Sequence, residues 1–553
     1  MIGDFDPAHK PYPSIRCPIY AREGMVASSS PQASAAGLEA LRIGGNAVDA
    51  AVAAAAALTV TEPCSNGIGS DAFALVWMNG TEGNGAGGNG GKGRLYGLNA
   101  SGKAPLNISI DKVKGAFGNC QKMPQSGWAP TMVPGAPKAW ARLAGRFGKL
   151  PLKKSMERAI HYACEGFPLG PTLPAFFAQA AERFKTFGGG QEIFDEWRKT
   201  FLPSGSVPCA GDMLVLKNHA ESLQKIADSN ADAFYSGELA GRIIADSEEN
   251  GGWFCAEDFA SYDVEWVEPV SVNYRGYDVW ELPPNGQGVA ALAALNILKE
   301  FEFSSRENPD TFHKQWEAMK MAFSDALSHI TDPHFMKEDF REWLHPEYGR
   351  KRAGEIGERA SLPLPVRPPS GGTVYLAAAD GEGNMVSYIQ SNYLGFGSGV
   401  VIRGTGISLQ NRGADFSLDP LAANALAPGK KSYHTIIPGF LTKNGKALGP
   451  FGVMGGYMQP QGHVQVITNM VDFGLNPQQA LDAPRWQWLE GRKVQVEPGF
   501  NAEILRVLAQ RGHEVSFSLD SASFGRGQII IRQDNGALLG ATEGRTCGNI
   551  AVL

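Results

Sequence analysis

One threonine stands where it could act as both a nucleophile and a base. Residues 361–372 read SLPLPVRPPSGG, and their four prolines favour an extended, solvated linker. Thr373 follows at once and opens the run TVYLAAA, which is rich in strand formers. If the bond between Gly372 and Thr373 were cut, a hydroxyl and a free α-amine with a pKa near ~8 would share one residue. Such a residue needs no catalytic histidine.

The same hydroxyl could make that cut, because it can attack the preceding carbonyl and Gly372 offers little steric obstruction there. Farther along, Gly455 and Gly456 follow the apolar run ALGPFGVM and precede an expected helix over 461–471. Backbone N–H groups at a strand-to-helix turn can form an oxyanion hole for acyl transfer. Judged locally, a structural threonine that opens a strand and a tight glycine turn remain the alternatives.

Other motifs carry less weight. The glycine-rich stretch 79–94 contains partial matches to the dinucleotide-binding motif GxGxxG. Because no βαβ pattern surrounds them, we interpret the stretch as a hairpin insertion. GLNASGK over 97–103 has the spacing of a phosphate loop, but Ala104 and Pro105 follow where a Ser or Thr and a helix belong. Asp332, His334 and Glu338 lack the HExxH spacing, so no metal or other cofactor is expected.

Elements of two kinds must position these residues. Helical patterns cover 31–58 (two helices, with Asn46 capping the second), 137–147, 152–164, 221–228, 288–300 and 309–328. After residue 373 the texture becomes strand-rich, beginning with TVYLAAA, the turn DGEGN and MVSYIQS. The sequence therefore divides into a helix-rich part and a strand-rich part.

Composition favours small-molecule chemistry. The 553 residues are 43% hydrophobic and 19% charged, as in globular proteins, and suggest several domains or one large layered unit. The net charge of −6 with both signs interspersed argues against a nucleic-acid partner. The apolar run 47–60 is shorter than the roughly 20 residues that span a bilayer, and the first residues lack the apolar core of a secretory signal. Seven scattered cysteines without a CxxC pair predict no disulfide framework. We expect a cytoplasmic protein without a membrane partner.

Long stretches of the chain resemble the γ-glutamyltransferase (γ-glutamyltranspeptidase) family of N-terminal-nucleophile hydrolases. The stretches are GMVASSSPQASAAGLEALRIGGNAVDAAVAAAAALTVTEPCSNGIGSDAFAL, TMVPGAPKAWARLAGRFGKLPL, AIHYACEGFPLGP, YRGYDVWELPPNGQG, EAMKMAFSDA and GTVYLAAADGEGNMVS. They keep the family's order over almost the whole chain. The resemblance implies an α+β fold, a four-layer αββα sandwich with a helix-rich N-terminal part.

The resemblance also implies a precursor that cuts itself before Thr373. Residues 1–372 would form a large subunit ending in the 361–372 linker, and residues 373–553 a small catalytic subunit. These fragments would form a heterodimer, and a dimer of that pair is plausible. By motif match, Thr373 is the nucleophile, Ser391 the supporting second hydroxyl, and Gly455 with Gly456 the oxyanion pair. Asp415, in LQNRGADFS, matches the aspartate that holds the α-amino group of a γ-glutamyl substrate.

The departures from the family pattern fall on the substrate side. Ser101 stands where the transferases carry an arginine that pairs with the substrate α-carboxylate, and losing that guanidinium weakens the grip on glutamyl groups. Tyr393 replaces an asparagine, Arg412 replaces a glutamine, and His434 with Thr435 replaces a serine pair. Arg412 could supply a relocated charge for a carboxylate, or could pair with Asp415 or on the surface.

The segments NYLGFGSGVV and YHTIIPGF resemble the cytoplasmic branch of the family, which includes an oxamate-hydrolysing amidase. We therefore expect a self-processing amide hydrolase or acyltransferase, with glutathione-type γ-glutamyl amides or small carboxylate-bearing amides such as oxamate as alternative substrates. An uncleaved, catalytically silent scaffold and, more remotely, an NTP-binding protein using Lys103 are the alternatives from other classes.

Overall fold

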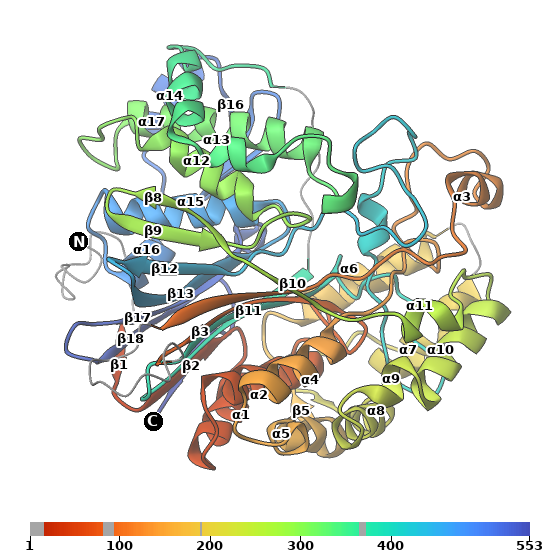
Figure 1. Ribbon diagram of the computed structural model, residues 1–553. Helices are drawn as coiled ribbons and strands as arrows, with labels where there is room; N and C mark the ends of the chain where they lie inside the picture. The colour runs from red at the N-terminus through yellow and green to blue at the C-terminus, as the bar shows by residue number, and fades with distance from the viewer. Residues whose placement is uncertain (1–15, 81–92, 188–190, 364–371) are drawn as a thin grey trace.

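The computed structural model describes residues 16–80, 93–187, 191–363 and 372–553. At its centre, two seven-stranded antiparallel sheets stack face to face (Figure 1). The first sheet has the order β1 (Ile19–Ala21), β18 (Leu538–Thr542), β17 (Arg526–Arg532), β13 (Lys446–Met454), β12 (Gly439–Lys443), β9 (Tyr277–Glu281) and β8 (Val270–Tyr274). The second has the order β19 (Asn549–Val552), β2 (Gly24–Ser28), β10 (Gly372–Asp380), β11 (Met385–Tyr393), β3 (Asp71–Met78), β4 (Arg94–Ala100) and β7 (Glu265–Val267).

Helices cover the outer face of each sheet (Figure 1). The layer on the second sheet comprises α1 (Pro31–Arg42), α2 (Ala47–Thr61), α4 (Ala136–Phe147) and α5 (Leu152–Glu165). The layer on the first sheet comprises α12 (Gly288–Leu298), α13 (Pro309–His329), α15 (Met458–Val471) and α16 (Pro477–Asp482). The expected αββα sandwich is confirmed.

The remaining elements lie around this sandwich. The other helices are α3 (Ile110–Ala116), α6 (Pro174–Lys185), α7 (Asp195–Phe201), α8 (Lys217–Asp228), α9 (Asp232–Tyr235), α10 (Glu238–Glu249), α11 (Ala256–Ala260), α14 (Pro346–Glu355) and α17 (Ala502–Gln510). Two small sheets pair β14 (Trp486–Glu490) with β15 (Lys493–Val496) and β16 (Glu514–Phe517), and β5 (Phe167–Pro168) with β6 (Met213–Leu214).

Helix α2 shows how the sequence produces the layering. Asn46 caps it by accepting from the N–H groups of Val48 and Asp49, and the Asp49 carboxylate accepts from the N–H of Asn46. Every residue of α2 is buried. Because most of them are alanine, the helix backbone can lie close to β10 and β11 on one side and to α5 on another. The predicted cap is confirmed.

Strands β10 and β11 form the hairpin expected from the sequence, and both are buried along their whole length. Their pairing joins Gly372 to Tyr393 and resumes at Val374 with Gln390, so Thr373 lies at an irregularity in the register. Such bulges re-aim a side chain relative to the regular ladder. The hydroxyl of Thr373 is thus placed at the rim of the sheet by the hairpin itself.

Both large sheets combine strands from before and after Thr373. In the first sheet, β1, β8 and β9 precede that residue and the other strands follow it; in the second, β10, β11 and β19 follow it. Residues 16–372 and 373–553 therefore share one core. The helix-rich part before Thr373 and the strand-rich part after it thus both contribute strands to each large sheet.

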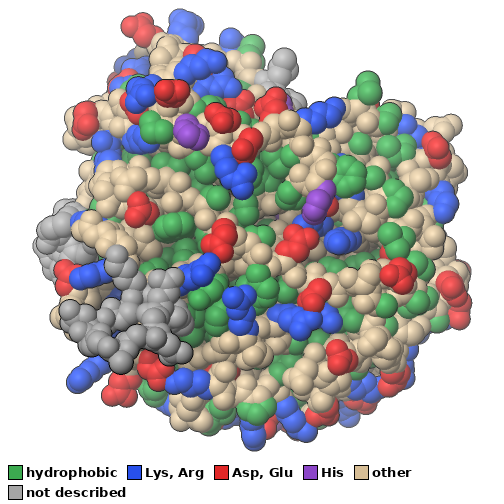
Figure 2. Space-filling model, viewed as in Figure 1, with side chains coloured by type: hydrophobic (Ala, Val, Ile, Leu, Met, Phe, Trp, Pro, Cys, Tyr) green, Lys and Arg blue, Asp and Glu red, His purple; other side chains and the backbone are tan. Residues whose placement is uncertain are grey.

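Several expectations can be checked directly. Residues 97–100 of the phosphate-loop imitation lie in β4, which pairs with β3 and β7, so they form no loop. The centre of the 79–94 insertion and most of the 361–372 linker lie outside the described residues. Charges of both signs are interspersed on the face shown in Figure 2. Among the described residues, no helix is both long and apolar enough to cross a membrane.

Candidate active site

The hydroxyl of Ser391 bridges the two groups that self-cleavage would join. Its Oγ lies 3.1 Å from the Oγ1 of Thr373 and donates to the carbonyl oxygen of Gly372 at 2.8 Å. The N–H of Tyr393 donates to the same Oγ at 2.8 Å, which fixes the serine rotamer. Both hydroxyl-bearing residues are buried. The arrangement holds the Thr373 hydroxyl beside the carbonyl of the preceding peptide.

A cavity of about 740 Å³ opens onto this bond. Gly372 and Gly455 both line it, so the candidate cleavage site and the candidate oxyanion turn border one space. Gly372 packs against backbone: a Cβ on it would lie 3.0 Å from the carbonyl oxygen of Cys64 and 3.3 Å from the Cα of Gly395. A small residue is therefore required before Thr373 for packing as well as for reactivity.

Gly455 and Gly456 form the turn between β13 and α15. Their φ angles are +145° and +60°, and the first is a conformation that only glycine adopts readily. Of the described residues, none accepts a hydrogen bond from the backbone N–H of either glycine. The carbonyl oxygen of Gly456 accepts from Nε2 of Gln287 at 2.9 Å. The turn thus presents two amide donors at the N-terminal end of a helix, where the helix dipole also favours negative charge.

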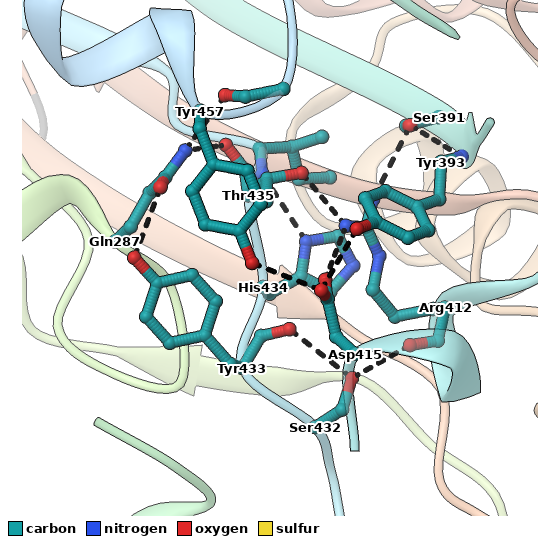
Figure 3. A network of polar contacts seen from close by, with 12 residues as sticks. Gln287, Ser391, Tyr393, Arg412, Asp415, Ser432, Tyr433, His434, Thr435 and Tyr457 are labelled. Carbon is teal, nitrogen blue, oxygen red and sulfur yellow. Dashed lines mark hydrogen bonds and ion pairs between the residues drawn. The ribbon is translucent and has the colours of Figure 1, made fainter. Parts of the chain in front are cut away.

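Arg412 and Asp415 lie at the centre of a buried polar network (Figure 3). Arg412 donates through Nη1 to Thr435 Oγ1 at 2.7 Å and through Nη2 to Ser391 Oγ at 3.4 Å. Its guanidinium lies 3.5 Å from the Asp415 carboxylate and 4.2 Å from the centre of the Tyr393 ring. The predicted pairing with Asp415 is present, and the same guanidinium also reaches the hydroxyl beside the nucleophile.

Asp415 is held by two phenols. Tyr393 and Tyr457 donate to its Oδ1 at 2.8 and 2.9 Å. Burial and the neighbouring carboxylate raise the pKa of Tyr393 well above its usual value, so the phenol stays protonated and keeps donating. Both phenols therefore hold Oδ1, while Oδ2 lies 3.5 Å from Nη1 of Arg412.

His434 and Asp71 form a second buried pair, with Nε2 of the ring 2.9 Å from Oδ2 of the carboxylate. The N–H of Ile436 donates to Nδ1 of His434, so Nε2 carries the proton and donates to Asp71. Burial, and secondarily Arg412, lower the pKa of His434 well below its usual value. Burial raises the pKa of Asp71 to about 7, opposed by Arg412 and by backbone N–H groups. The histidine is therefore neutral and orients Asp71.

Ser101 does not stand free to meet a substrate. It is buried, and its Oγ accepts from Nδ2 of Asn285 at 2.9 Å, while another contact of the same amide reaches the carbonyl of Ser432. Ser432 in turn donates to the backbone carbonyl of Arg412. Ser101 thus supports the arginine segment at a distance, and it brings no charge to the site.

Sequence reasoning overlooked several supporting residues. Gln287 ties the carbonyls of Thr435 and Gly456 together, and Tyr433 donates to its Oε1. Arg526 approaches the carbonyl of Thr373 at 3.5 Å while it pairs with Glu62. Gln287 and Tyr457 stand next to recognised motifs, which could have singled them out. Arg526 has no such signal, because its contacts Glu62 and Thr373 lie 464 and 153 positions away along the chain.

One group of described side chains could hold a metal ion, and it lies apart from this site. Ligand atoms of His313, Glu317 and His513 fall within 4.8 Å of one another. Lys320 already pairs with Glu317 at 2.7 Å, so a second cation there would meet a like charge. In the triplet noted from sequence, Asp332 pairs with His334 at 3.0 Å, whereas Glu338 pairs with His329.

Comparison with known proteins decides the family. The model of the family described as gamma-glutamyltranspeptidase matches residues 33–553. The chain belongs to this family. It is therefore an enzyme of the N-terminal-nucleophile amidohydrolase type, with the self-processing amide hydrolase or acyltransferase activity expected from the resemblance.

Individual members of the gamma-glutamyltranspeptidase family are similar over nearly the whole chain. A glutathione hydrolase-like YwrD proenzyme from Bacillus subtilis is 36% identical, covering 96% of this chain and 98% of the relative. An oxamate amidohydrolase proenzyme from Klebsiella pneumoniae is 32% identical, with the same coverage. The crystal structure of a cephalosporin acylase from Bacillus halodurans shares 54% identity, with a TM-score of 0.92 and 99% of each chain covered.

Proposed function

We propose that the chain cuts itself between Gly372 and Thr373 and that the new N-terminal Thr373 is the nucleophile of amide hydrolysis. The observation that carries this is the Ser391 hydroxyl, which contacts Thr373 Oγ1 and donates to the Gly372 carbonyl. Attack of Oγ1 on that carbonyl moves the Gly372 acyl group from nitrogen to oxygen. Water then hydrolyses the ester, leaving a Gly372 carboxylate and a free Thr373 amine.

In turnover, the freed amine takes the proton from Thr373 Oγ1 as the hydroxyl attacks the substrate amide. The N–H groups of Gly455 and Gly456 would stabilise the oxyanion, and the proton passes to the departing amine. Water, or in a transfer reaction another amine, then releases the acyl group from Thr373. The two phenols that bind Asp415, together with Gln287, hold the walls of the site during both steps.

For the acyl part of the substrate, we infer a short group that carries a carboxylate. Arg412 is one hydroxyl away from the nucleophile, through Ser391, so it can reach a carboxylate close to the scissile carbonyl. The longer γ-glutamyl group would need a cation farther from the scissile carbonyl, and Ser101 brings no charge there. Similarity to the oxamate amidohydrolase supports this choice, whereas the glutathione hydrolase-like relative supports γ-glutamyl amides as the second candidate.

A substrate panel tests the acyl assignment. Mature enzyme would be assayed against oxamate, short dicarboxylate monoamides, glutathione and γ-glutamyl anilides. We expect the carboxylate-bearing short amides to be hydrolysed fastest, and Arg412→Gln to raise their KM by about tenfold or more, as for a lost charged hydrogen bond. Arg506→Gln, which removes an exposed ion pair, serves as the control. Faster turnover of glutathione, or an unchanged KM in Arg412→Gln, would contradict the assignment.

We also propose that the two fragments remain together, that the pair could dimerise again, and that the enzyme works in the cytoplasm. The interleaved sheets support the first point. None of the seven cysteines, all of which lie in the described residues, forms a disulfide, which suits a reducing compartment.

A further inference from the structure

The cavity beside Gly372 carries an arginine without a carboxylate partner. Among the described residues that line it are Arg183, Arg526 and Arg545, against a single carboxylate, the exposed Asp520. Arg526 pairs with Glu62 at 3.0 Å, and Arg545 pairs with both Glu497 and Glu543. No described residue brings a carboxylate into ion-pair contact with Arg183. Its charge is the uncompensated one.

The protein provides hydrogen-bond acceptors for only some of the N–H donors of Arg183. Nη2 donates to the carbonyls of Gly395 and Gly397 at 2.6 and 3.0 Å, whereas Nε has no hydrogen-bond partner in the described structure. No described residue accepts from Nη1 either. Burial lowers the pKa of Arg183 to about 10, which an adjacent anion would reverse. A half-buried guanidinium with unused donors beside a cavity is suited to bind an anionic ligand.

Arg183 lies close to the reacting bond. Gly395, whose carbonyl it binds, packs against Gly372 so tightly that a Cβ on Gly372 would approach the Gly395 Cα to 3.3 Å. The cavity that Arg183 lines also includes Gly455 of the oxyanion turn. Arg412, which we assigned to the acyl group, does not line this cavity. The cavity is therefore a candidate space for the amine half of the substrate.

The walls of the cavity add an apolar contribution. Phe176 of α6 is half-buried, and Leu519 at the rim is 89% exposed. If an apolar part of a ligand packs against this exposed leucine, burial of the apolar surface contributes about 25 cal/mol to the binding free energy for each Å² buried. A ligand with an apolar body and a terminal anion would satisfy Leu519, Phe176 and Arg183 together.

We propose that Arg183 forms a subsite for a carboxylate on the amine leaving group, so that the preferred substrates are amides of amino acids or aminoaryl acids. This inference rests on the proposed function, because it takes the acyl group to lie on the Arg412 side of Thr373. Arg183 determines specificity here and takes no part in bond making. The alternative is that it serves only to hold the turn containing Gly395 and Gly397.

The test compares two leaving groups of equal shape. The acyl group that wild-type enzyme hydrolyses fastest would be attached to 4-aminobenzoate and to 4-aminobenzamide. We expect wild-type kcat/KM to favour the carboxylate, and Arg183→Gln to reduce that preference by about tenfold, as for a lost charge-assisted hydrogen bond. Arg183→Lys should retain part of it. Lys185→Gln, an exposed charge loss on the same helix, should leave the preference unchanged.

Binding of 4-aminobenzoate and 4-aminobenzamide to mature protein, followed by ligand NMR, separates the subsite from the reaction. Tighter binding of 4-aminobenzoate to wild type supports the subsite even if neither amide is hydrolysed, in which case the proposed acyl chemistry fails instead. If Arg183→Gln does not mature, the wild-type comparison still decides. Equal binding of the two probes, or equal losses for both substrates in Arg183→Gln, would overturn the proposal and leave the turn-holding role.

Discussion

At the scale of single residues, the Ser391 hydroxyl makes the contacts on which the proposed mechanism depends most. Its hydroxyl contacts Oγ1 of Thr373, the carbonyl of Gly372 and the guanidinium of Arg412, and the N–H of Tyr393 donates to it. Removing it leaves Thr373 without a partner that orients the hydroxyl toward attack. The same serine would act in self-cleavage and in turnover, since both reactions use the same oxygen.

Ser391→Ala should slow self-cleavage and amide turnover by about a hundredfold, the loss typical when one donor to a developing charge is removed. Ser387→Ala removes another buried hydroxyl of β11, one that shares a hydrogen bond with the Tyr375 phenol in the described structure, and should leave both rates near wild type. Band intensities over time on a denaturing gel and initial rates would measure the two effects. Equal rates for both variants would contradict the role of Ser391.

Asp71 makes stability depend on pH. Its pKa rises from 3.8 to about 7 on burial, so the folded chain binds this proton more readily than the unfolded chain over that interval. Stability from this group is complete below 3.8 and is lost as the pH rises through about 7.

Asp71→Asn should therefore gain stability relative to wild type as the pH rises, by up to about 1.4 kcal/mol per pH unit. Melting temperatures of both proteins near about pH 5 and about pH 7 would show it. A difference between the two proteins that stays constant with pH would show that Asp71 is ionised throughout.

The sequence predicts the site residues that lie in or beside recognisable motifs, but it does not predict which distant residues contact them. Thr373, Ser391 and the glycine pair were named from the chain, and the structure brings Thr373 and Ser391 into contact. Arg412 was left between two roles, and the structure shows it in contact with both Asp415 and Ser391. Asp71 lies 363 positions from His434 along the chain. No local pattern reports such a pairing.

At the scale of elements, the turn between β13 and α15 depends on glycine geometry. Gly455 has a φ of +145°, and a Cβ there would lie 3.0 Å from the Cα of Gly525. Any other residue must rotate the following peptide, which re-aims the N–H groups away from the oxyanion. The turn was predictable as a strand-to-helix junction, whereas its φ angles follow from packing against β17.

Gly455→Ala should lower both stability and kcat/KM, with a stability loss of about 1–3 kcal/mol from backbone strain. Gly44→Ala provides the matched control, because Gly44 also has a positive φ, +96°, and nothing lies within 4 Å of its would-be Cβ. We expect it to lose stability alone. Melting temperatures and kinetics of matured protein would separate the effects, and a Gly455→Ala enzyme with normal kcat/KM would contradict the oxyanion role.

At the scale of the whole molecule, cleavage before Thr373 would cut a connection without dividing a core. Each large sheet holds strands from both sides of that residue, and α2 from the first part packs on β10 and β11 from the second. The sequence indicated the layers through helix and strand patterns. It could not indicate the strand order, because pairings such as that of β2 with β10 and β19 join distant segments.

We therefore expect the two fragments to elute as one species on size exclusion and to separate only in denaturant. A denaturing gel of the eluted peak would show both fragments. Dissociation without denaturant would contradict the shared core.

The central claim concerns the bond ahead of Thr373, and intact-mass analysis of purified protein tests it most directly. The account predicts two chains, residues 1–372 and 373–553 apart from any trimming at their outer ends, with the second beginning at Thr373 and gaining the mass of an acyl group when turnover is trapped. Thr373→Ala should give one uncut chain with no acyl adduct. A wild-type chain that stays whole, or a trapped acyl group on any other residue, would contradict it.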